Sequence, residues 1–186
     1  MGFLLRMARI IDTGTEWVGR IAFRLSLLMV LLAAANAVAR YQSRFTGVNL
    51  SSNAFIEAQW YLFAMLFLLG GGYALKHGAH VRVDVLYGRL GPRGRAWINL
   101  VGDLIFLIPF CLFMLRFTWP MVVSSWEVME QSPDPGGLPR YPIKTLIPLA
   151  FVLLLLQGAA DAIKQAALLR GLIEPEPDEA PIGEVA

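Results

Sequence analysis

Residues 96–115 read AWINLVGDLIFLIPFCLFML, twenty residues between Arg95 and Arg116 that include a single charge, Asp103. The hydrocarbon core of a bilayer is about 30 Å thick, and a helix that rises about 1.5 Å per residue needs about 20 apolar residues to cross it. This stretch therefore predicts a membrane-spanning helix.

Three other apolar runs are bounded by charged residues in the same way. They are residues 25–39, 58–75 and 145–160. The middle run is long enough by itself, and the other two reach the needed length when the charged side chains at their ends extend toward the lipid headgroups. We therefore predict an all-α membrane protein with a transmembrane domain at 21–164. Its four spans are predicted at about 21–40, 58–76, 96–117 and 143–163.

The composition of the 186-residue chain argues against other classes of protein. Charged residues make up 16 % of it, whereas soluble domains carry about 25 %. The net charge of +2 is too small for a nucleic-acid interface, so we expect no nucleic-acid partner. A single cysteine permits neither an internal disulfide nor a cysteine-based metal cage.

The Lys and Arg residues predict the orientation, because cytoplasmic loops carry an excess of them. Eleven lie on one side of the predicted membrane: Arg6, Arg9, Arg20, Arg24, Lys76, Arg82, Arg89, Arg93, Arg95, Lys164 and Arg170. Five lie on the other side: Arg40, Arg44, Arg116, Arg140 and Lys144. We therefore predict that both termini are cytoplasmic.

The first span has one alternative interpretation, a cleaved signal peptide. A basic start and an apolar run precede Ala37, Val38 and Ala39, which form a small-residue cleavage pattern. The segment before the run is about twenty residues long, however, and it contains Asp12 and Trp17. These features favour a retained span.

Two segments are predicted to be short amphipathic helices in the membrane surface. In the first, at 1–20, polar residues recur at three- and four-residue steps, which is typical of an interfacial helix. An extension of the first span explains this pattern equally well. In the second, residues 83–90 combine an apolar helical face with a Gly-Pro stop. Residues 165–186 are predicted to be a cytoplasmic tail whose Glu- and Pro-rich distal part is disordered.

Residues with catalytic or cofactor-binding chemistry are scarce in the sequence. Haem anchors need histidines inside the bilayer, but His77 and His80 lie in a predicted loop, where we interpret them as structural or solvent-facing. Cys111 lies in the middle of a span and is interpreted as a small apolar filler. The sequence shows no nucleophile–base pair, phosphate loop or paired carboxylates. We therefore predict no enzymatic activity, metal site or cofactor in this chain.

Asp103 is the one charge deep in a predicted span, and Asn99 lies one turn before it on the same face. An intramembrane carboxylate costs about 2.5–3.5 kcal/mol on insertion scales and marks a functional candidate. We predict that Asp103 and Asn99 share a polar network with Arg24, which would fix the first span on the third. A proton or ion site is the alternative. Pro109 is expected to kink the third span.

The end of the second span carries Gly70, Gly71 and Gly72. Consecutive glycines let another helix or a lipid approach the backbone closely, and flexibility before the loop is the alternative. Arginines on the same side of the membrane are expected to bind lipid phosphates. The candidate residues for contact with a partner or with lipid are Glu57, Trp60, Gly70, Gly71, Gly72, Arg82, Asp84, Arg89, Arg93 and Arg95.

The loop before the fourth span is acidic and rich in proline. Its acidic residues are Glu127, Glu130 and Asp134, and four prolines lie within residues 132–142. Proline fixes φ and has no N–H to donate. We therefore predict a stiff loop that presents its carbonyl groups.

Several short stretches together carry a family resemblance. They are Glu57–Trp60, Gly70–Lys76, His80–Asp84, Ser125–Glu127, Ser132–Pro139 and Tyr141–Lys144. In their order and spacing, over about residues 17–164, they resemble the small membrane subunit of tripartite ATP-independent periplasmic (TRAP) transporters, the DctQ-like family.

The resemblance implies a role in a complex of the bacterial inner membrane. In such transporters a periplasmic substrate-binding protein delivers an organic acid to a large DctM-like subunit, which holds the substrate and sodium sites and moves as an elevator. The small subunit packs against the scaffold of the large one and has no substrate site or cofactor. Glu127, Glu130 and Asp134 become candidates for contact with the periplasmic protein, a solvated loop being the alternative. The alternative function is a self-sufficient small four-helix transporter.

Overall fold

The computed structural model describes residues 2–47, 52–79 and 90–173, and most of these residues are helical. The helices are α1 (Gly2–Thr46), α2 (Asn53–Lys76), α4 (Pro92–Gly102), the π-helical segment η1 (Asp103–Leu107), α5 (Ile108–Glu127) and α6 (Arg140–Leu169). Segments α4, η1 and α5 follow one another as a single rod of 36 residues. Four helices, counting this rod as one, are long and apolar enough to span a membrane, which confirms the predicted fold class.

The first helix is longer than a membrane is thick. Its 45 residues extend for about 65–70 Å at 1.5 Å per residue. Within the segment that the sequence sets apart as interfacial, residues 2–20 are the first part of this same helix and not a separate element. Its position relative to the membrane surface stays a prediction. Residues 83–89 of the predicted short helix lie outside the described residues, as does most of the predicted tail.

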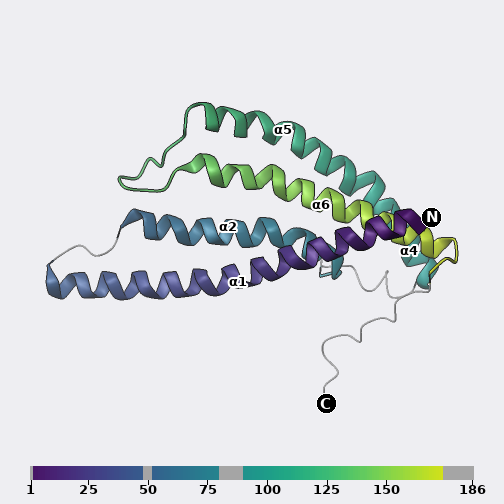
Figure 1. Cartoon of the computed structure of the whole chain (residues 1–186), viewed down its shortest axis with the longest axis horizontal. Coiled ribbons are helices and arrows are strands. Elements are labelled where there is room, and N and C mark those ends of the chain that lie inside the picture. Colours follow the sequence, from purple (N-terminus) through teal and green to yellow (C-terminus); the bar gives the residue numbers. More distant parts are fainter. Residues whose placement is uncertain (1, 48–51, 80–89, 174–186) are drawn as a thin grey trace, which may run out of the picture.

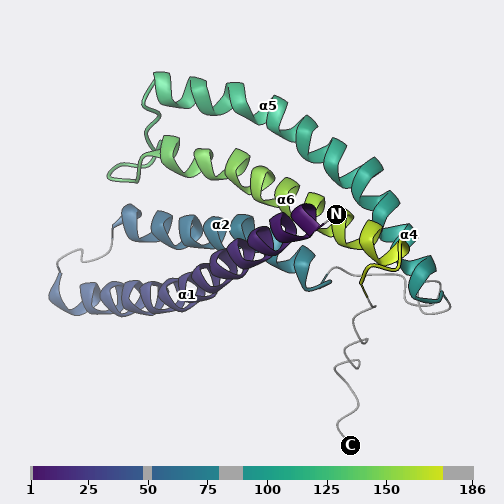
Figure 2. The ribbon, with the colours of Figure 1, turned by 45° about the vertical axis from the view of Figure 1, so that its right-hand side comes forward.

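The helices lie side by side in the order α1, α2, α6, α5 (Figures 1 and 2). Helix α6 contacts α2, α5 and α4, and the N-terminal part of α1 crosses over onto it. We call the end of the molecule with Gly2, Lys76, Pro92 and Leu169 the terminal end. The opposite end, with the connection between α5 and α6, is the loop end.

The interior of this arrangement is built from small side chains. Seven of the ten buried apolar residues in the described part of the chain are alanines, among them Ala8, Ala96 and Ala160. Large side chains such as Phe23 and Phe67 are at least 70 % exposed. Helices in a bilayer gain little from burying large apolar side chains against one another, because lipid tails are equally apolar, and small residues let their backbones approach. The packing therefore suits a protein surrounded by lipid or by a membrane partner.

Two glycines mark the closest approaches between helices. A Cβ atom on Gly19 would lie 2.2 Å from Cδ2 of Tyr73, and one on Gly158 would lie 2.6 Å from Cδ2 of Leu107. In the predicted glycine run, only Gly72 meets other helices, at 3.8 Å from the Leu153 carbonyl oxygen. The positions of Gly70 and Gly71 are open. The sequence therefore points to the right segment, but it misses the two tighter contacts.

The third span is irregular just before Pro109. The N–H of Ile108 donates to the carbonyl of Asp103, five residues earlier, at the end of the π-helical segment. Proline has no N–H and cannot continue the α-helical ladder, and a π-turn is one way in which a helix accommodates such a break. The irregularity predicted at Pro109 therefore takes the form of a π-helical segment that begins at Asp103.

Candidate functional site

At the loop end, one face of α2 holds the connection between α5 and α6. Glu57, predicted to contact a partner, is instead only 2 % exposed. Its carboxylate accepts hydrogen bonds from the hydroxyl of Ser132 and the N–H of Leu138. Asn53, one turn earlier, donates from Nδ2 to the Pro135 carbonyl at 3.0 Å. The loop is therefore fixed on α2 by side chains that lie on one helical face.

The next turn of α2 adds a further donor to this face. Tyr61 donates from its hydroxyl to the carbonyl of Pro139 at 2.9 Å. Gly137 is required for the close fit, because a Cβ there would lie 2.7 Å from Oε2 of Glu57 and 2.5 Å from Oγ of Ser132. The proline-rich loop does present its carbonyls, and α2 is the element that receives them.

A second group of polar contacts joins the ends of α5 and α6. Glu130 accepts hydrogen bonds from Lys144 and from the hydroxyl of Ser125, and its carbonyl accepts the N–H of Arg140 at 2.8 Å. The hydrogen bonds from Lys144 and Ser125 lower the pKa of Glu130 below its ordinary value. Glu130 thus fixes the loop from within.

The other predicted acidic contacts behave differently from Glu130. Glu127 and Asp134 are exposed at the loop end. Arg140 lies close enough to act electrostatically on both Glu57 and Glu130. Sequence reasoning missed this arginine, although a single arginine just before an apolar span is a recognisable signal.

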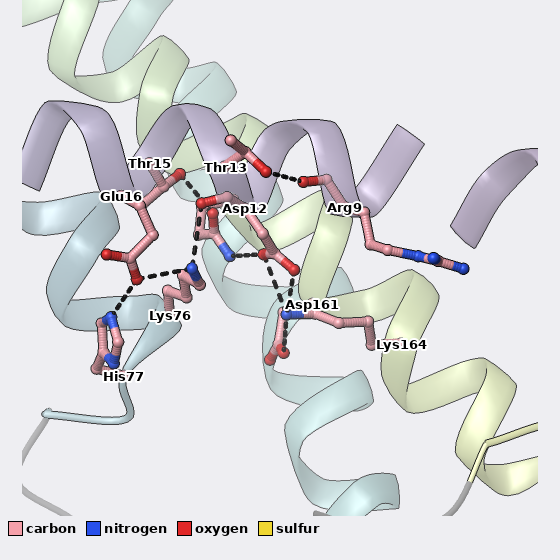
Figure 3. Close-up of polar contacts among 10 residues, drawn as sticks. Arg9, Asp12, Thr13, Thr15, Glu16, Lys76, His77, Asp161 and Lys164 are labelled. Atoms are coloured by element: carbon pink, nitrogen blue, oxygen red, sulfur yellow. Dashed lines mark hydrogen bonds and ion pairs between the residues drawn. The ribbon is translucent and has the colours of Figure 1, made fainter. Parts of the chain in front are cut away.

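The terminal end carries a polar cluster where α1, α2 and α6 cross (Figure 3). Gln157 on α6 is completely buried. Its Oε1 accepts the hydroxyl of Thr15 at 2.6 Å, and its Nε2 donates to Asp12 at 2.9 Å. Lys164 donates to the same carboxylate at 3.2 Å. These contacts bind the first helix to the last.

A neighbouring set of contacts ties α1 to the end of α2. Lys76 donates from Nζ to Glu16 at 2.7 Å and to the Asp12 carbonyl at 3.1 Å. His77 lies 2.7 Å from the same Glu16 oxygen (Figure 3). Sequence reasoning missed these α1 and α6 partners. Gln157, a polar residue inside an apolar run, was the signal that could have indicated them.

Asp103 does not meet Arg24 as predicted. Asp103 is 7 % exposed, and the charged groups that act on it are Asp161 and Lys164 of α6. Arg24 is exposed on α1, whose main packing partners are α2 and α6. The predicted network is therefore replaced by one between the third and fourth spans, because α6 lies between α1 and the rod that carries Asp103 (Figure 1). Asn99 does take part in interactions of its own.

The remaining candidate residues lie on the surface or outside the described part. Trp60 is 41 % exposed and packs edge-on against Tyr61. Arg93 lines a groove between α4 and the end of α6, and Arg95 donates from Nε to the Leu90 carbonyl at 3.0 Å. Arg82, Asp84 and Arg89, with His80, lie outside the described residues. Across residues 2–47, 52–79 and 90–173, no group of three or more His, Cys, Asp or Glu side chains has the geometry for a metal.

These features define a multi-pass membrane protein whose polar side chains tie its helices together at both ends. Residues 29–168 match the family model of the DctQ component of tripartite ATP-independent periplasmic transporters, and the chain belongs to this family. It is therefore a small permease subunit of a TRAP transporter, a transport component of the inner membrane, as the resemblance predicted.

Two relatives agree with this assignment. The ectoine TRAP transporter small permease protein TeaB of Halomonas elongata is 31 % identical over 139 residues, which cover 74 % of this chain and 69 % of the relative. A putative TRAP transporter small permease protein of Haemophilus influenzae is 34 % identical over 92 residues, half of this chain and 53 % of the relative. No solved structure matches this chain.

Proposed function

We propose that this subunit packs against the stationary scaffold of a large DctM-like membrane subunit. It would thereby enlarge the part of that scaffold that is anchored in the bilayer. The complex would be a sodium-coupled elevator that takes up organic acids. The substrate and sodium sites would lie in the large subunit, and this chain would carry neither a substrate site nor a cofactor. The observation that carries the proposal is the exposure of large apolar side chains along all four spans.

The side-by-side arrangement supports a scaffolding role. The four helices lie in a row (Figure 2), and large apolar side chains are exposed along them. A partner could therefore cover one face of the row while lipid contacts the other. Both ends of the row are tied by charged and polar contacts, which would keep it rigid while another part of the complex moves. An elevator mechanism requires one part of the complex to stay fixed while another part moves across the membrane.

One stripe on α2 is our candidate for the surface that meets the large subunit. Trp60, Phe63 and Phe67 are exposed, and Gly70 and Gly71 have open space above their backbones. Residues at three-, four- and seven-residue steps share a helical face. A partner helix could pack its side chains against the three aromatic rings and could approach the α2 backbone closely at the two glycines.

The orientation completes the proposal. The excess of Lys and Arg at the terminal end would place that end in the cytoplasm, and the loop end would then face the periplasm. There Glu127 and Asp134, exposed beside a loop that is fixed on α2, would contact the substrate-binding protein.

Co-purification tests the proposal. The tagged chain is co-expressed with the large membrane protein encoded beside it, and the detergent extract is purified through the tag. We expect a stoichiometric complex with a much larger polytopic partner. A chain that instead purifies alone as a stable dimer and moves a solute in liposomes would overturn the proposal in favour of a self-sufficient transporter.

A further inference from the structure

The buried carboxylate of Asp103 has one oxygen without a partner. Asp103 begins the π-helical segment of the third span and is 7 % exposed. Its Oδ2 is buried and forms no hydrogen bond with any residue that the structure describes. A buried oxygen left in this state is costly. Oδ2 therefore needs a hydrogen-bond donor or a cation that the surrounding described residues do not supply.

A second carboxylate faces Asp103 from α6. The side chain of Asp161 lies close enough to act electrostatically on it, and η1 packs against α6. Two ionised carboxylates only accept hydrogen bonds, so a bond between them requires a proton on one of the two. We propose that Asp103 and Asp161 form a proton-binding site that joins the third and fourth spans at the terminal end.

The charges around the pair favour a bound proton. Lys164 lies 4.0 Å from Asp161 and 3.2 Å from Asp12 of α1. Its ammonium group opposes protonation of Asp103, but it is shared among three carboxylates and offsets only one of their charges. Like-charged carboxylates that share a site bind a proton more readily, because the proton removes their repulsion. A metal ion is less well supported, since the described residues offer no cluster with metal-holding geometry.

Two other groups of charged side chains near the terminal end have partners of their own. Glu16 of α1 binds Lys76 and His77 of α2. Arg95 of α4 donates from Nε to the carbonyl of Leu90. Among the described residues, the charged groups that act on Asp103 are thus Asp161 and Lys164 of α6.

The site makes the packing of two spans depend on pH. With one proton bound, the pair holds η1 against α6. When the proton leaves, two negative charges face each other in a buried place, and this contact becomes repulsive. Stability is therefore greatest when the proton is bound and falls as the pH rises through the range in which the pair releases it.

The experiment measures the unfolding midpoint of the full chain in lipid nanodiscs between about pH 5 and about pH 9. We expect the wild-type midpoint to fall as the pH rises. Asp103→Asn and Asp161→Asn should each remove that fall, because an amide cannot release a proton and donates to the remaining carboxylate. Glu127→Gln, which changes an exposed carboxylate at the loop end, is the control and should keep it. Infrared difference spectra should show the carbonyl band of a protonated carboxyl in the wild type and lose it in Asp103→Asn.

Three results would overturn the proposal. The first is a wild-type midpoint that does not change with pH, and the second is an Asp103→Asn midpoint with the wild-type pH dependence. The third is a midpoint that follows the sodium or potassium concentration at fixed pH, which would assign the site to a metal cation. If Asp103→Asn does not fold, the wild-type infrared band and its loss in Asp161→Asn decide the matter.

Discussion

The carboxylate of Glu57 on α2 accepts the backbone N–H of Leu138, a residue that lies 81 positions later in the chain. A glutamate at the start of an apolar span is costly unless its oxygens are occupied. Here a loop from the other half of the molecule occupies them. The contact therefore has two effects: it supplies hydrogen bonds to a buried carboxylate, and it fixes the proline-rich loop on α2.

The first prediction concerns this contact. Glu57→Ala leaves the Ser132 hydroxyl and the Leu138 N–H without their acceptor, and unpaired buried donors destabilise a fold. We expect a lower unfolding midpoint in detergent and faster proteolysis within residues 128–139. Glu127→Ala, which removes an exposed carboxylate from the same end, should change neither measurement. Equal behaviour of the two variants would contradict the assigned role of Glu57.

The second prediction compares two glycines of α1. A methyl group on Gly19 would lie 2.2 Å from the Tyr73 ring, whereas Gly14 has nothing within 4 Å. Gly14→Ala should stabilise the protein by about 1 kcal/mol, because alanine is the better helix former. Gly19→Ala should instead lower the unfolding midpoint, because the ring must move. Stabilisation by both substitutions would show that α1 does not pack closely on α2 at this point.

The third prediction concerns the crossing of α1 and α6. Gln157→Leu keeps the volume but removes the partners of Thr15 and of one Asp12 oxygen. We expect a loss of about 1–3 kcal/mol in the free energy of unfolding, measured by denaturation in mixed micelles. The control is Gln165→Leu, two turns further along α6 on a partly exposed position, and it should be nearly neutral. An unchanged free energy of unfolding in Gln157→Leu would mean that the hydrogen bonds of Gln157 do not stabilise the crossing of α1 and α6.

The fourth prediction is a pH dependence at the loop end. Hydrogen bonds from Lys144 and Ser125 hold the pKa of Glu130 below its ordinary value of 4.5. The unfolded chain therefore binds this proton more readily than the folded one, so the stabilisation is present above pH 4.5 and is lost as the pH falls below it. Thermal unfolding below pH 4.5 should thus show less acid sensitivity in Glu130→Gln than in the wild type. Glu127→Gln should keep the wild-type sensitivity.

The fifth prediction tests the proposed partner face of α2. Gly71→Leu adds bulk where the chain itself has open space, so the variant should fold normally. If the large subunit docks there, the amount of it that co-purifies should fall severalfold. Gly14→Leu adds the same bulk to open space on α1 and should not reduce the yield. An unchanged yield for Gly71→Leu would move the interface to another face.

Much of the architecture could be predicted from the sequence. The four spans follow from the transfer of each apolar run into lipid, a property of each segment alone. The break in the α-helical ladder near Pro109 follows from the missing N–H of proline, and the carbonyl groups that the proline-rich loop was expected to present accept hydrogen bonds from α2. The family, too, could be expected from short stretches of sequence, and residues 29–168 match its model.

The partners of the polar residues could not be predicted in the same way. Hydropathy places Arg24, Asp103 and Asp161 near the same membrane surface, and it allows any pair of them to meet. Only the lateral order of the helices, in which α6 lies between α1 and the third span, decides that Asp103 meets Asp161 and leaves Arg24 exposed. The same holds for Glu57, because burial of a charge depends on which distant group arrives to bond it. The sequence by itself thus determined where the chain crosses the membrane, since each crossing is a local property. The tertiary structure decided which side chains meet, since that depends on packing between segments far apart in the chain.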